Sequence, residues 1–235
     1  MTAFMILLRS FIFNLLFYGG TILIGILCAP TLLMSQRATR NIGVFWGVYT
    51  NFILRYVTGI HHRIKGDKHL DKQMIYAAKH QSAWETMSLA WHLDSPAIVL
   101  KQELTKIPLL GWMMAHSGAI GVDRDAGMKA LKKLKIDAIT AKEAGRSLQI
   151  YPQGTRVAPD EIVDYQIGIY AIYQATNLPV VPIALNSGQF WGKRAFRKTP
   201  GTITVSFLPP IPPGLDRKSF MAQLEDAIET EMKQL

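Results

Sequence analysis

Apolar residues dominate the first sixty positions of this chain, and no charged residue lies between Arg9 and Arg37. Roughly twenty apolar residues form a helix that spans a bilayer core, so residues 10–29 are long enough to cross one. Pro30 breaks this helix, and a second apolar segment with several glycines follows over residues 41–60. Basic residues flank both segments without a clear difference between the two sides. We expect a helical hairpin embedded in one leaflet; a single transmembrane span and a cleaved signal peptide are the alternatives.

From about residue 63 short apolar runs alternate with amphipathic stretches. Strands that alternate with helices favour an α/β fold with a mixed, mostly parallel sheet flanked by helices. Pro182 lies inside one predicted strand, and because proline cannot donate to a ladder we expect that strand to be at a sheet edge or bulged there. The pattern predicts strands over 73–79, 96–100, 119–122, 147–151, 180–185 and 202–208, and helices over 82–92, 104–114, 126–144, 168–176 and 219–235.

These patterns divide the chain into a membrane-anchoring segment, residues 1–62, and a globular domain, residues 63–235. The net charge is +9, from 26 Lys and Arg against 17 Asp and Glu, which indicates anionic partners such as lipid headgroups, an acidic substrate or an acidic carrier. No zinc-finger spacing, RNP-like motif or basic heptad region is present, so we expect no nucleic-acid partner. The single cysteine, Cys28, excludes an intramolecular disulfide.

The most informative residues are His80 and Glu85, five positions apart at the start of the helix predicted over 82–92. On one straight helix the two side chains would point about 140° apart, so the pair forms only if His80 precedes the helix. Ser82 is a suitable N-cap, which places His80 in the turn and Glu85 in the first helical turn. The carboxylate would then orient the imidazole as a general base. Ser82 and Glu85 also form a capping box, in which Glu85 only bonds the N-cap amide.

Four blocks of sequence together resemble the glycerolipid acyltransferases with the HxxxxD motif, specifically the 1-acylglycerol-3-phosphate acyltransferases. His80–Glu85 is similar to HxxxxD, and residues 151–156 (YPQGTR) resemble FPEGTR. Residues 118–124 (GAIGVDR) are similar to the second block, and residues 181–185 (VPIAL) to the fourth. The blocks come in the family's order and cover about residues 63 to 190, which makes residues 63–235 the acyltransferase catalytic domain.

The resemblance implies transfer of a fatty acyl chain from acyl-carrier protein or acyl-CoA to the sn-2 hydroxyl of lysophosphatidic acid, giving phosphatidic acid for phospholipid biosynthesis. It implies neither a cofactor nor a metal, and no metal-ligand cluster is visible in the sequence. It also implies a membrane location, which we expect to be a bacterial inner membrane with the catalytic domain on the cytoplasmic face. By block position the site residues are His80 as base, Glu85 as its orienter, Arg124 and Arg156 as phosphate ligands, Gly154 and Thr155 as the cradle, and Gln153 as a further substrate-binding residue.

Two residues depart from the family pattern. Glu85 stands in the place of the usual aspartate, and Gln153 in the place of the glutamate of FPEGTR. A neutral amide accepts and donates hydrogen bonds and removes a negative charge beside the phosphate site. Gln153 therefore keeps other acceptors open, namely glycerol-3-phosphate or a lyso-aminolipid. Rivals of another class are a non-catalytic membrane lipid-binding protein and a thioesterase-like hydrolase.

A run of lysines follows Arg124 on the helix predicted over 126–144. Such a run forms either a solvated face or a docking surface for an acidic acyl-carrier protein or anionic lipid. The alternatives to a phosphate role are an exposed ion pair for Arg124, which stands beside two aspartates, and a solvated turn residue for Arg156. The lysines are Lys129, Lys132, Lys133 and Lys135.

Overall fold

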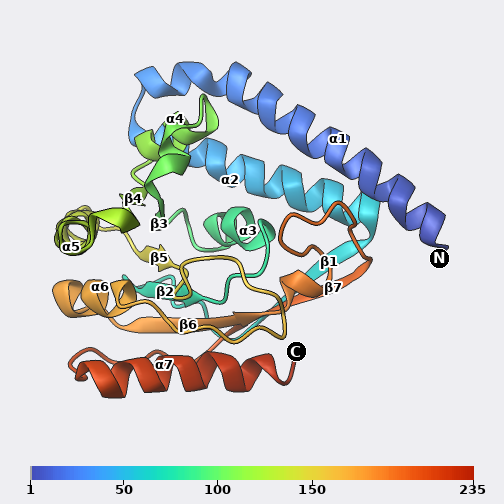
Figure 1. Cartoon of the computed structure of the whole chain (residues 1–235). Coiled ribbons are helices and arrows are strands. Elements are labelled where there is room, and N and C mark those ends of the chain that lie inside the picture. Colours follow the sequence, from blue (N-terminus) through green and yellow to red (C-terminus); the bar gives the residue numbers. More distant parts are fainter. Residues whose placement is uncertain (1) are drawn as a thin grey trace.

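A computed structural model describes residues 2–235 as a central sheet with helices on both of its faces and a long pair of helices, α1 and α2, across one side (Figure 1). The strands are β1 (Ile60–Lys65), β2 (Ile75–Ala78), β3 (Ala97–Lys101), β4 (Ile120–Val122), β5 (Leu148–Ile150), β6 (Val180–Leu185) and β7 (Gly201–Phe207). The α-helices are α1 (Ala3–Cys28), α2 (Gln36–Ile53), α3 (Trp84–His92), α4 (Leu110–His116), α5 (Met128–Glu143), α6 (Gly168–Thr176) and α7 (Arg217–Met232). Short helical turns are η1 (Ala29–Leu33), η2 (Leu54–Thr58), η3 (Gln102–Lys106), η4 (Arg124–Ala126) and η5 (Ser187–Gln189).

The seven strands form one sheet in the order β1-β7-β6-β2-β5-β3-β4. Strand β2 pairs in parallel with both β5 and β6, and β3 pairs in parallel with β4 and β5. Between β6 and β7 the pairing is antiparallel, while β7 pairs in parallel with β1. The predicted mixed, mostly parallel sheet is therefore confirmed.

Pro182 does not mark a sheet edge, because β6 lies between β2 and β7. Of the two expected alternatives, the sheet edge is wrong and the bulge is found. The Pro182 carbonyl accepts the Leu208 N–H at 3.0 Å, and the next paired residues are Val180 and Ile211. Two residues along β6, from 182 to 180, are thus opposite three residues along the segment that follows β7, from 208 to 211. This one-residue offset is a bulge. A central strand tolerates the proline because the ladder to β7 is already interrupted there.

The helix predicted over 104–114 is also wrong, because the structure divides it into η3 and α4. Leu109, between the two, has a φ of 62°, which ends one helical stretch before the next begins. Pro108 precedes it and lacks the N–H that a continuous helix would use. Strand β1 was not predicted: it begins at Ile60, where the second apolar segment was expected to end, and it crosses the expected boundary between residues 62 and 63.

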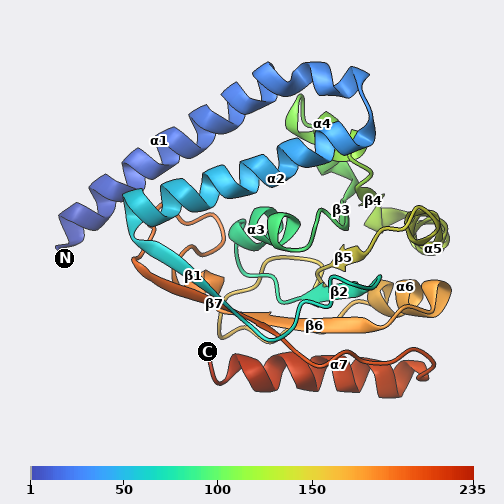
Figure 2. The ribbon, with the colours of Figure 1, turned by 180° about the vertical axis from the view of Figure 1, so that it is seen from behind.

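Two hydrophobic cores lie on opposite faces of the sheet. Figures 1 and 2 show α1, α2 and α3 on one side of the sheet and α7 on the other. One lies under α1, α2 and α3, with the fully buried Phe13, Trp84 and Leu89. The other lies under α5, α6 and α7, with the fully buried Ile169, Phe220 and Leu224. Burial of both faces explains why β6 is apolar at every position.

Helix α1 buries one narrow stripe and exposes the rest. Its buried residues extend from Ile6 through Phe13 and Phe17 to Gly25. Together with η1 it forms the one candidate membrane span within residues 2–235, with a mean hydropathy of 2.1 and 17% of its most apolar stretch buried. The large apolar residues left exposed include Phe4, Leu7, Phe11, Leu15, Ile22, Leu23 and Leu27.

The segment between β6 and β7 holds the buried stripe of α1. The Lys198 N–H donates to Ser10 Oγ at 2.8 Å, and Lys198 Nζ donates to Asn14 Oδ1 at 3.1 Å. The Trp191 ring lies edge-on against Phe13 at 5.2 Å between centroids. Side chains from both sides of the contact are therefore interlocked, and α1 is part of the folded molecule.

Candidate active site

The predicted site residues follow the carboxyl ends of neighbouring parallel strands. His80 comes shortly after β2, Tyr151 directly after β5, and Ser187 shortly after β6. Because β5 and β6 both flank β2 in parallel, these three ends meet at one edge of the sheet. The fold thereby brings together residues more than one hundred positions apart.

His80 and Glu85 form the predicted pair. His80 Nδ1 lies 2.9 Å from Glu85 Oε1, and the carboxylate is fully buried. Helix α3 begins at Trp84, so His80 precedes the helix as expected, although the helix starts two residues later than predicted. Since the carboxylate holds Nδ1, the Nε2 atom is the nitrogen left for a substrate proton.

Glu85 also closes the turn that carries His80. Its Oε1 accepts the backbone N–H groups of Gln81 at 2.7 Å and Ser82 at 2.6 Å. The capping box expected with Ser82 as N-cap forms only in part: Glu85 accepts the Ser82 N–H, but the N-cap of α3 is Ala83, and Ser82 Oγ accepts the Trp84 N–H at 3.1 Å. The same oxygen atom fixes the backbone of the turn and the ring of its histidine.

The Tyr151 ring covers one face of His80. The two rings stack 3.9 Å apart with an angle of 17° between their planes, and the His80 side chain keeps 15% of its surface exposed. Gln149 Nε2 donates to the Tyr151 hydroxyl at 2.7 Å, and burial raises the pKa of this tyrosine, which keeps it neutral. Sequence reasoning treated Tyr151 only as part of its block and missed this contact.

Ser187 is a second residue that sequence reasoning missed. Its hydroxyl donates to Glu85 Oε2 at 2.8 Å across 102 positions of sequence, and it is fully buried. The neighbouring Gly188 N–H donates to Gln81 Oε1 at 2.9 Å, which fastens η5 to the His80 turn. The available signal was its position: Ser187 is the first hydroxyl after the strand 180–185, as His80 follows the strand 73–79.

The turn over residues 151–156 lies against the same edge. Gly154 has a φ of 69°, a conformation that favours glycine, and its N–H donates to the Tyr151 carbonyl at 2.9 Å. The Arg124 Nη2 donates to the Gly154 carbonyl, so the second and third blocks meet in space. A side chain at position 154 would also press on the Arg124 guanidinium, since an added Cβ would lie 3.3 Å from it.

Gln153 joins this turn to His80. Its Oε1 accepts the His80 backbone N–H at 3.0 Å, and the residue is buried. Thr155 is exposed and Arg156 is half-buried in the same turn, and the Val157 N–H donates back to the His80 carbonyl at 2.9 Å. The structure thus brings the predicted residues of the first three blocks into one site.

The lysine run on α5 is only partly free. Lys133 forms an ion pair with Asp137, and Lys135 Nζ donates to Gln174 at 3.4 Å. Lys129 and Lys132 are exposed. Two of the four charges are therefore engaged within the protein.

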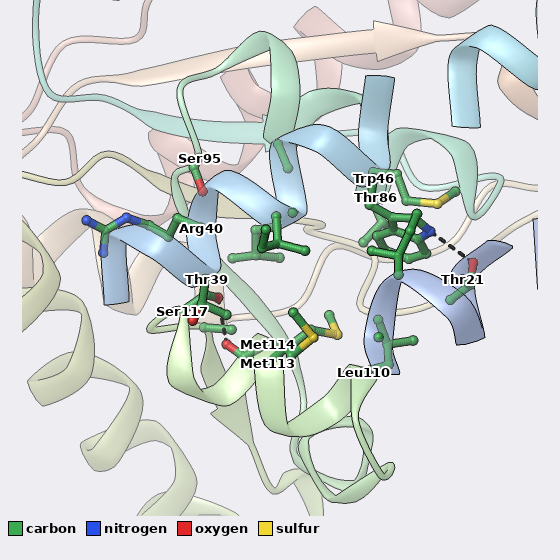
Figure 3. Close-up of a pocket in the computed structure, with 18 of the residues that line it drawn as sticks. Thr21, Thr39, Arg40, Trp46, Thr86, Ser95, Leu110, Met113, Met114 and Ser117 are labelled. Carbon is green, nitrogen blue, oxygen red and sulfur yellow. Dashed lines mark hydrogen bonds between the residues drawn. The ribbon is translucent and has the colours of Figure 1, made fainter. Parts of the chain in front are cut away.

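An apolar pocket of about 100 Å³ lies between α1, α2, α3, β3 and α4 (Figure 3). Trp46, Met87 and Met113 line it, and the stem of Arg40 lies at its edge. Thr86, the residue after Glu85, also lines it, and the Tyr151 hydroxyl donates to Thr86 Oγ1 at 3.5 Å. The wall of the pocket is therefore one residue away from the His80–Glu85 pair.

Comparison with known proteins agrees with this geometry. A family model described as Acyltransferase matches residues 57–186. A 1-acyl-sn-glycerol-3-phosphate acyltransferase of Pseudomonas aeruginosa is 33% identical, over 84% of this chain and 78% of its own length. A protein of the same name from Limnanthes douglasii is 29% identical, over 73% of this chain and 62% of its own length, which is less than two thirds.

The fold agrees as well. The crystal structure of the 1-acyl-sn-glycerophosphate (LPA) acyltransferase PlsC from Thermotoga maritima is similar, with a TM-score of 0.77 and 19% identity, covering 97% of both chains. That likeness shows the fold. The match to the family model, together with the relative at 33% identity, shows the family. The chain therefore belongs to the acyltransferase family, and its relatives include 1-acyl-sn-glycerol-3-phosphate acyltransferases.

Proposed function

We propose that this protein transfers a fatty acyl chain from a thioester donor, acyl-carrier protein or acyl-CoA, to the sn-2 hydroxyl of lysophosphatidic acid, giving phosphatidic acid. The observation that carries the proposal is the His80–Glu85 pair at the carboxyl edge of the sheet, 2.9 Å apart. The names of the relatives supply the acceptor, because they act on 1-acyl-sn-glycerol-3-phosphate.

In the proposed mechanism His80 Nε2 removes the proton of the acceptor hydroxyl while the hydroxyl oxygen attacks the thioester carbonyl carbon. Glu85 stabilises the imidazolium that results, as the carboxylate does in a serine-protease triad. When the tetrahedral intermediate collapses, the carbon–sulfur bond breaks and His80 returns the proton to the leaving thiolate. The Tyr151 ring supports the imidazole from one face throughout, since the two rings lie 3.9 Å apart.

The turn over residues 151–156 is the proposed phosphate site. Arg156 lies in the turn and Arg124 reaches it from η4 through its bond to Gly154. Guanidinium groups match phosphate oxygens in geometry and charge. Gly154 and Thr155 shape the cradle, and Gln153 connects it to the His80 backbone. The phosphate would thus be held beside the base.

We propose that the apolar pocket beside Thr86 receives the acyl chain. It opens between the catalytic helix α3 and the anchoring helices α1 and α2, so a lipid tail could enter it from the membrane side. We further propose residues 1–62 as the anchoring segment and 63–235 as the catalytic domain, with the start of β1 at Ile60 as the junction between them.

The hairpin itself is proposed to lie in one leaflet. The buried stripe of α1 extends from Ile6 to Gly25, so one side of the helix contacts the protein along nearly its whole length. An α1 that crossed the bilayer would take its partner Lys198 and the segment around it into the hydrocarbon, where a cation is costly. We propose that the protein is attached to the bacterial inner membrane, with the catalytic domain on its cytoplasmic face.

The test is acyl transfer by the purified protein in lipid, with lysophosphatidic acid and glycerol-3-phosphate offered separately and with both donors. Phosphatidic acid formed from lysophosphatidic acid alone, and abolished by His80→Ala, is the expected result. Product from glycerol-3-phosphate or from a lyso-aminolipid would move the acceptor assignment. Free fatty acid without acceptor would indicate a hydrolase, and lipid binding unaffected by His80→Ala without any turnover would indicate a non-catalytic protein.

A further inference from the structure

Glu85 uses its two oxygens differently. Oε1 accepts three hydrogen bonds, from His80 Nδ1 and from the N–H groups of Gln81 and Ser82. Within residues 2–235, Oε2 has a single donor, the Ser187 hydroxyl at 2.8 Å. The carboxylate is fully buried, so water does not replace a donor that is removed.

We propose that Ser187 is a positioning residue for the reaction: its hydroxyl fixes the rotation of the Glu85 carboxylate and thereby the orientation of His80. This inference rests on the proposed role of His80 as base. Without the Ser187 hydroxyl, Oε2 is a buried charged atom that lacks a hydrogen-bond donor. Rotation of the carboxylate toward another donor then lowers its free energy. Such a turn moves Oε1 away from His80 Nδ1.

The environment of Ser187 suits this role. Helical turn η5 is held against the His80 turn by a separate hydrogen bond, from Gly188 N–H to Gln81 Oε1 at 2.9 Å. The Ser187 carbonyl also accepts the Trp191 N–H at 2.9 Å. These bonds involve backbone atoms of η5, so Ser187→Ala leaves them in place and removes only the contact to Glu85.

The experiment compares kcat and KM of the full chain in lipid for Ser187→Ala, Ser187→Thr and a control, Ser206→Ala. Ser206 is also a buried serine, and its Oγ has no hydrogen-bond partner in the described part of the chain. We expect Ser187→Ala to lower kcat roughly 10- to 100-fold with KM for lysophosphatidic acid within about twofold, because a hydrogen bond to a charged group is lost. Ser187→Thr keeps the hydroxyl and should restore most of kcat, and Ser206→Ala should leave kcat unchanged.

A double-mutant cycle separates positioning from general damage. In a Glu85→Gln background the charge that Ser187 serves is gone, so adding Ser187→Ala should lower kcat by less than about twofold. Full additivity of the two changes would overturn the inference, as would wild-type kcat in Ser187→Ala. If Ser187→Ala does not fold, Ser187→Thr and Ser187→Cys replace it, and equal kcat for the hydroxyl and the thiol, a weaker donor, would count against the role.

The variants His80→Ala and Ser187→Ala separate the positioning role of Ser187 from the proposed function on which it rests. Activity retained in His80→Ala would overturn the proposed function itself. Activity lost in His80→Ala but intact in Ser187→Ala would remove only the positioning role.

Discussion

At the scale of single residues, one carboxylate serves both the fold and the proposed chemistry. Glu85 Oε1 fixes the backbone of the turn through Gln81 and Ser82 and orients His80 at 2.9 Å. Sequence reasoning posed these as alternatives, because Glu85 belongs both to the Ser82–Glu85 spacing of a capping box and to the His80–Glu85 pair. In the structure one oxygen makes both sets of contacts, since the N–H groups of Gln81 and Ser82 lie in the same turn as His80, ahead of the first residue of α3.

Gln153 shows what the departure from the family pattern changes at this scale. Its Oε1 accepts the His80 backbone N–H, a bond that a glutamate oxygen would also accept. Its Nε2 is buried and has no hydrogen-bond partner within residues 2–235. The substitution therefore preserves the link to His80 and replaces an acceptor with a donor on the other side of the group.

The proposed phosphate site can be tested at this scale. Arg156→Ala should raise KM for lysophosphatidic acid roughly 10- to 100-fold and change KM for the acyl donor by less than about threefold, because a charge-assisted bond to phosphate is lost. Steady-state kinetics with each substrate varied in turn measure both values. Arg217→Ala, an exposed arginine at the start of α7, is the control. Equal rises for both substrates would contradict the assignment.

At the scale of elements, close packing between helices decides how α2 meets α3. A Cβ at Gly47 would lie 2.7 Å from the Met87 carbonyl oxygen, closer than a real contact allows. Met87 also lines the pocket, so the approach of α2 to α3 sets one wall of it. Hydropathy alone could not reveal this, because a glycine inside an apolar segment has the same pattern whether it packs or not.

A pair of substitutions on α2 tests this packing. Gly47→Ala should destabilise the protein by about 1–3 kcal/mol, because the added methyl meets a backbone atom that cannot move aside cheaply. Gly43→Ala, on the same helix, has nothing within 4 Å of the added atom and should stabilise by about 0.5–1 kcal/mol. Thermal or chemical unfolding of both variants measures the difference. Equal effects would show that α2 does not approach α3 so closely.

In the segment between β6 and β7, Lys198 makes the stability of the fold depend on pH. Burial lowers the pKa of Lys198 from its usual 10.5 to about 8, while Lys198 Nζ donates to the Ala195 and Phe196 carbonyls at 2.9 Å each. Below pH 8 the lysine is charged in both folded and unfolded chains, and its burial opposes folding. Between about pH 8 and 10.5 the unfolded chain binds more protons than the folded one, so stability rises with pH across this range.

Lys198→Met should therefore reduce the rise in melting temperature between pH 7.5 and about 9.5 relative to the parent protein. The methionine cannot titrate, although it also loses the bonds to Asn14 and the carbonyls. Differential scanning calorimetry at both pH values measures the rise, and Lys193→Met, at an exposed lysine of the same segment, is the control. An identical rise in parent and variant would show that Lys198 does not titrate in this window.

At the scale of the whole molecule, the candidate site lies between the sheet and the helical pair α1 and α2. The carboxyl ends of β2, β5 and β6 meet beside α3, and α3 packs against α2 of the hairpin. The apolar pocket lies between α3 and the helices α1 and α2, and Figure 3 shows the residues that line it. The proposed base, phosphate site and lipid-tail pocket are consequently built from segments distributed over most of the chain.

Membrane attachment gives the prediction at this scale. Leu15 on α1 is 64% exposed, so Leu15→Asp should weaken binding to phospholipid vesicles by more than about tenfold while the fold remains intact. Ile162, 78% exposed in the catalytic domain, is the matched control, and Ile162→Asp should bind as the parent does. Vesicle sedimentation measures both. Equal binding by the two variants would contradict lipid contact along α1.

The local pattern of residues was sufficient for most of the elements and for the four blocks on which the proposed chemistry rests. Strand 180–185 and helix 168–176 have the predicted bounds, because their apolar runs end at polar residues or at turn formers. The site blocks were visible because His80, Glu85 and residues 151–156 are each local in sequence. Such features depend on neighbours along the chain, and neighbours along the chain are what a sequence displays.

Only the tertiary structure decided which distant residues meet. The strand order places β6 beside β2, and this alone brings Ser187 to Glu85 across 102 positions and puts Pro182 in the interior of the sheet. The stack of Tyr151 on His80 depends equally on β5 lying on the other side of β2. The physical reason is that strand order is set by the burial of both sheet faces under helices at once, which lowers the free energy of the whole domain and depends on no single segment.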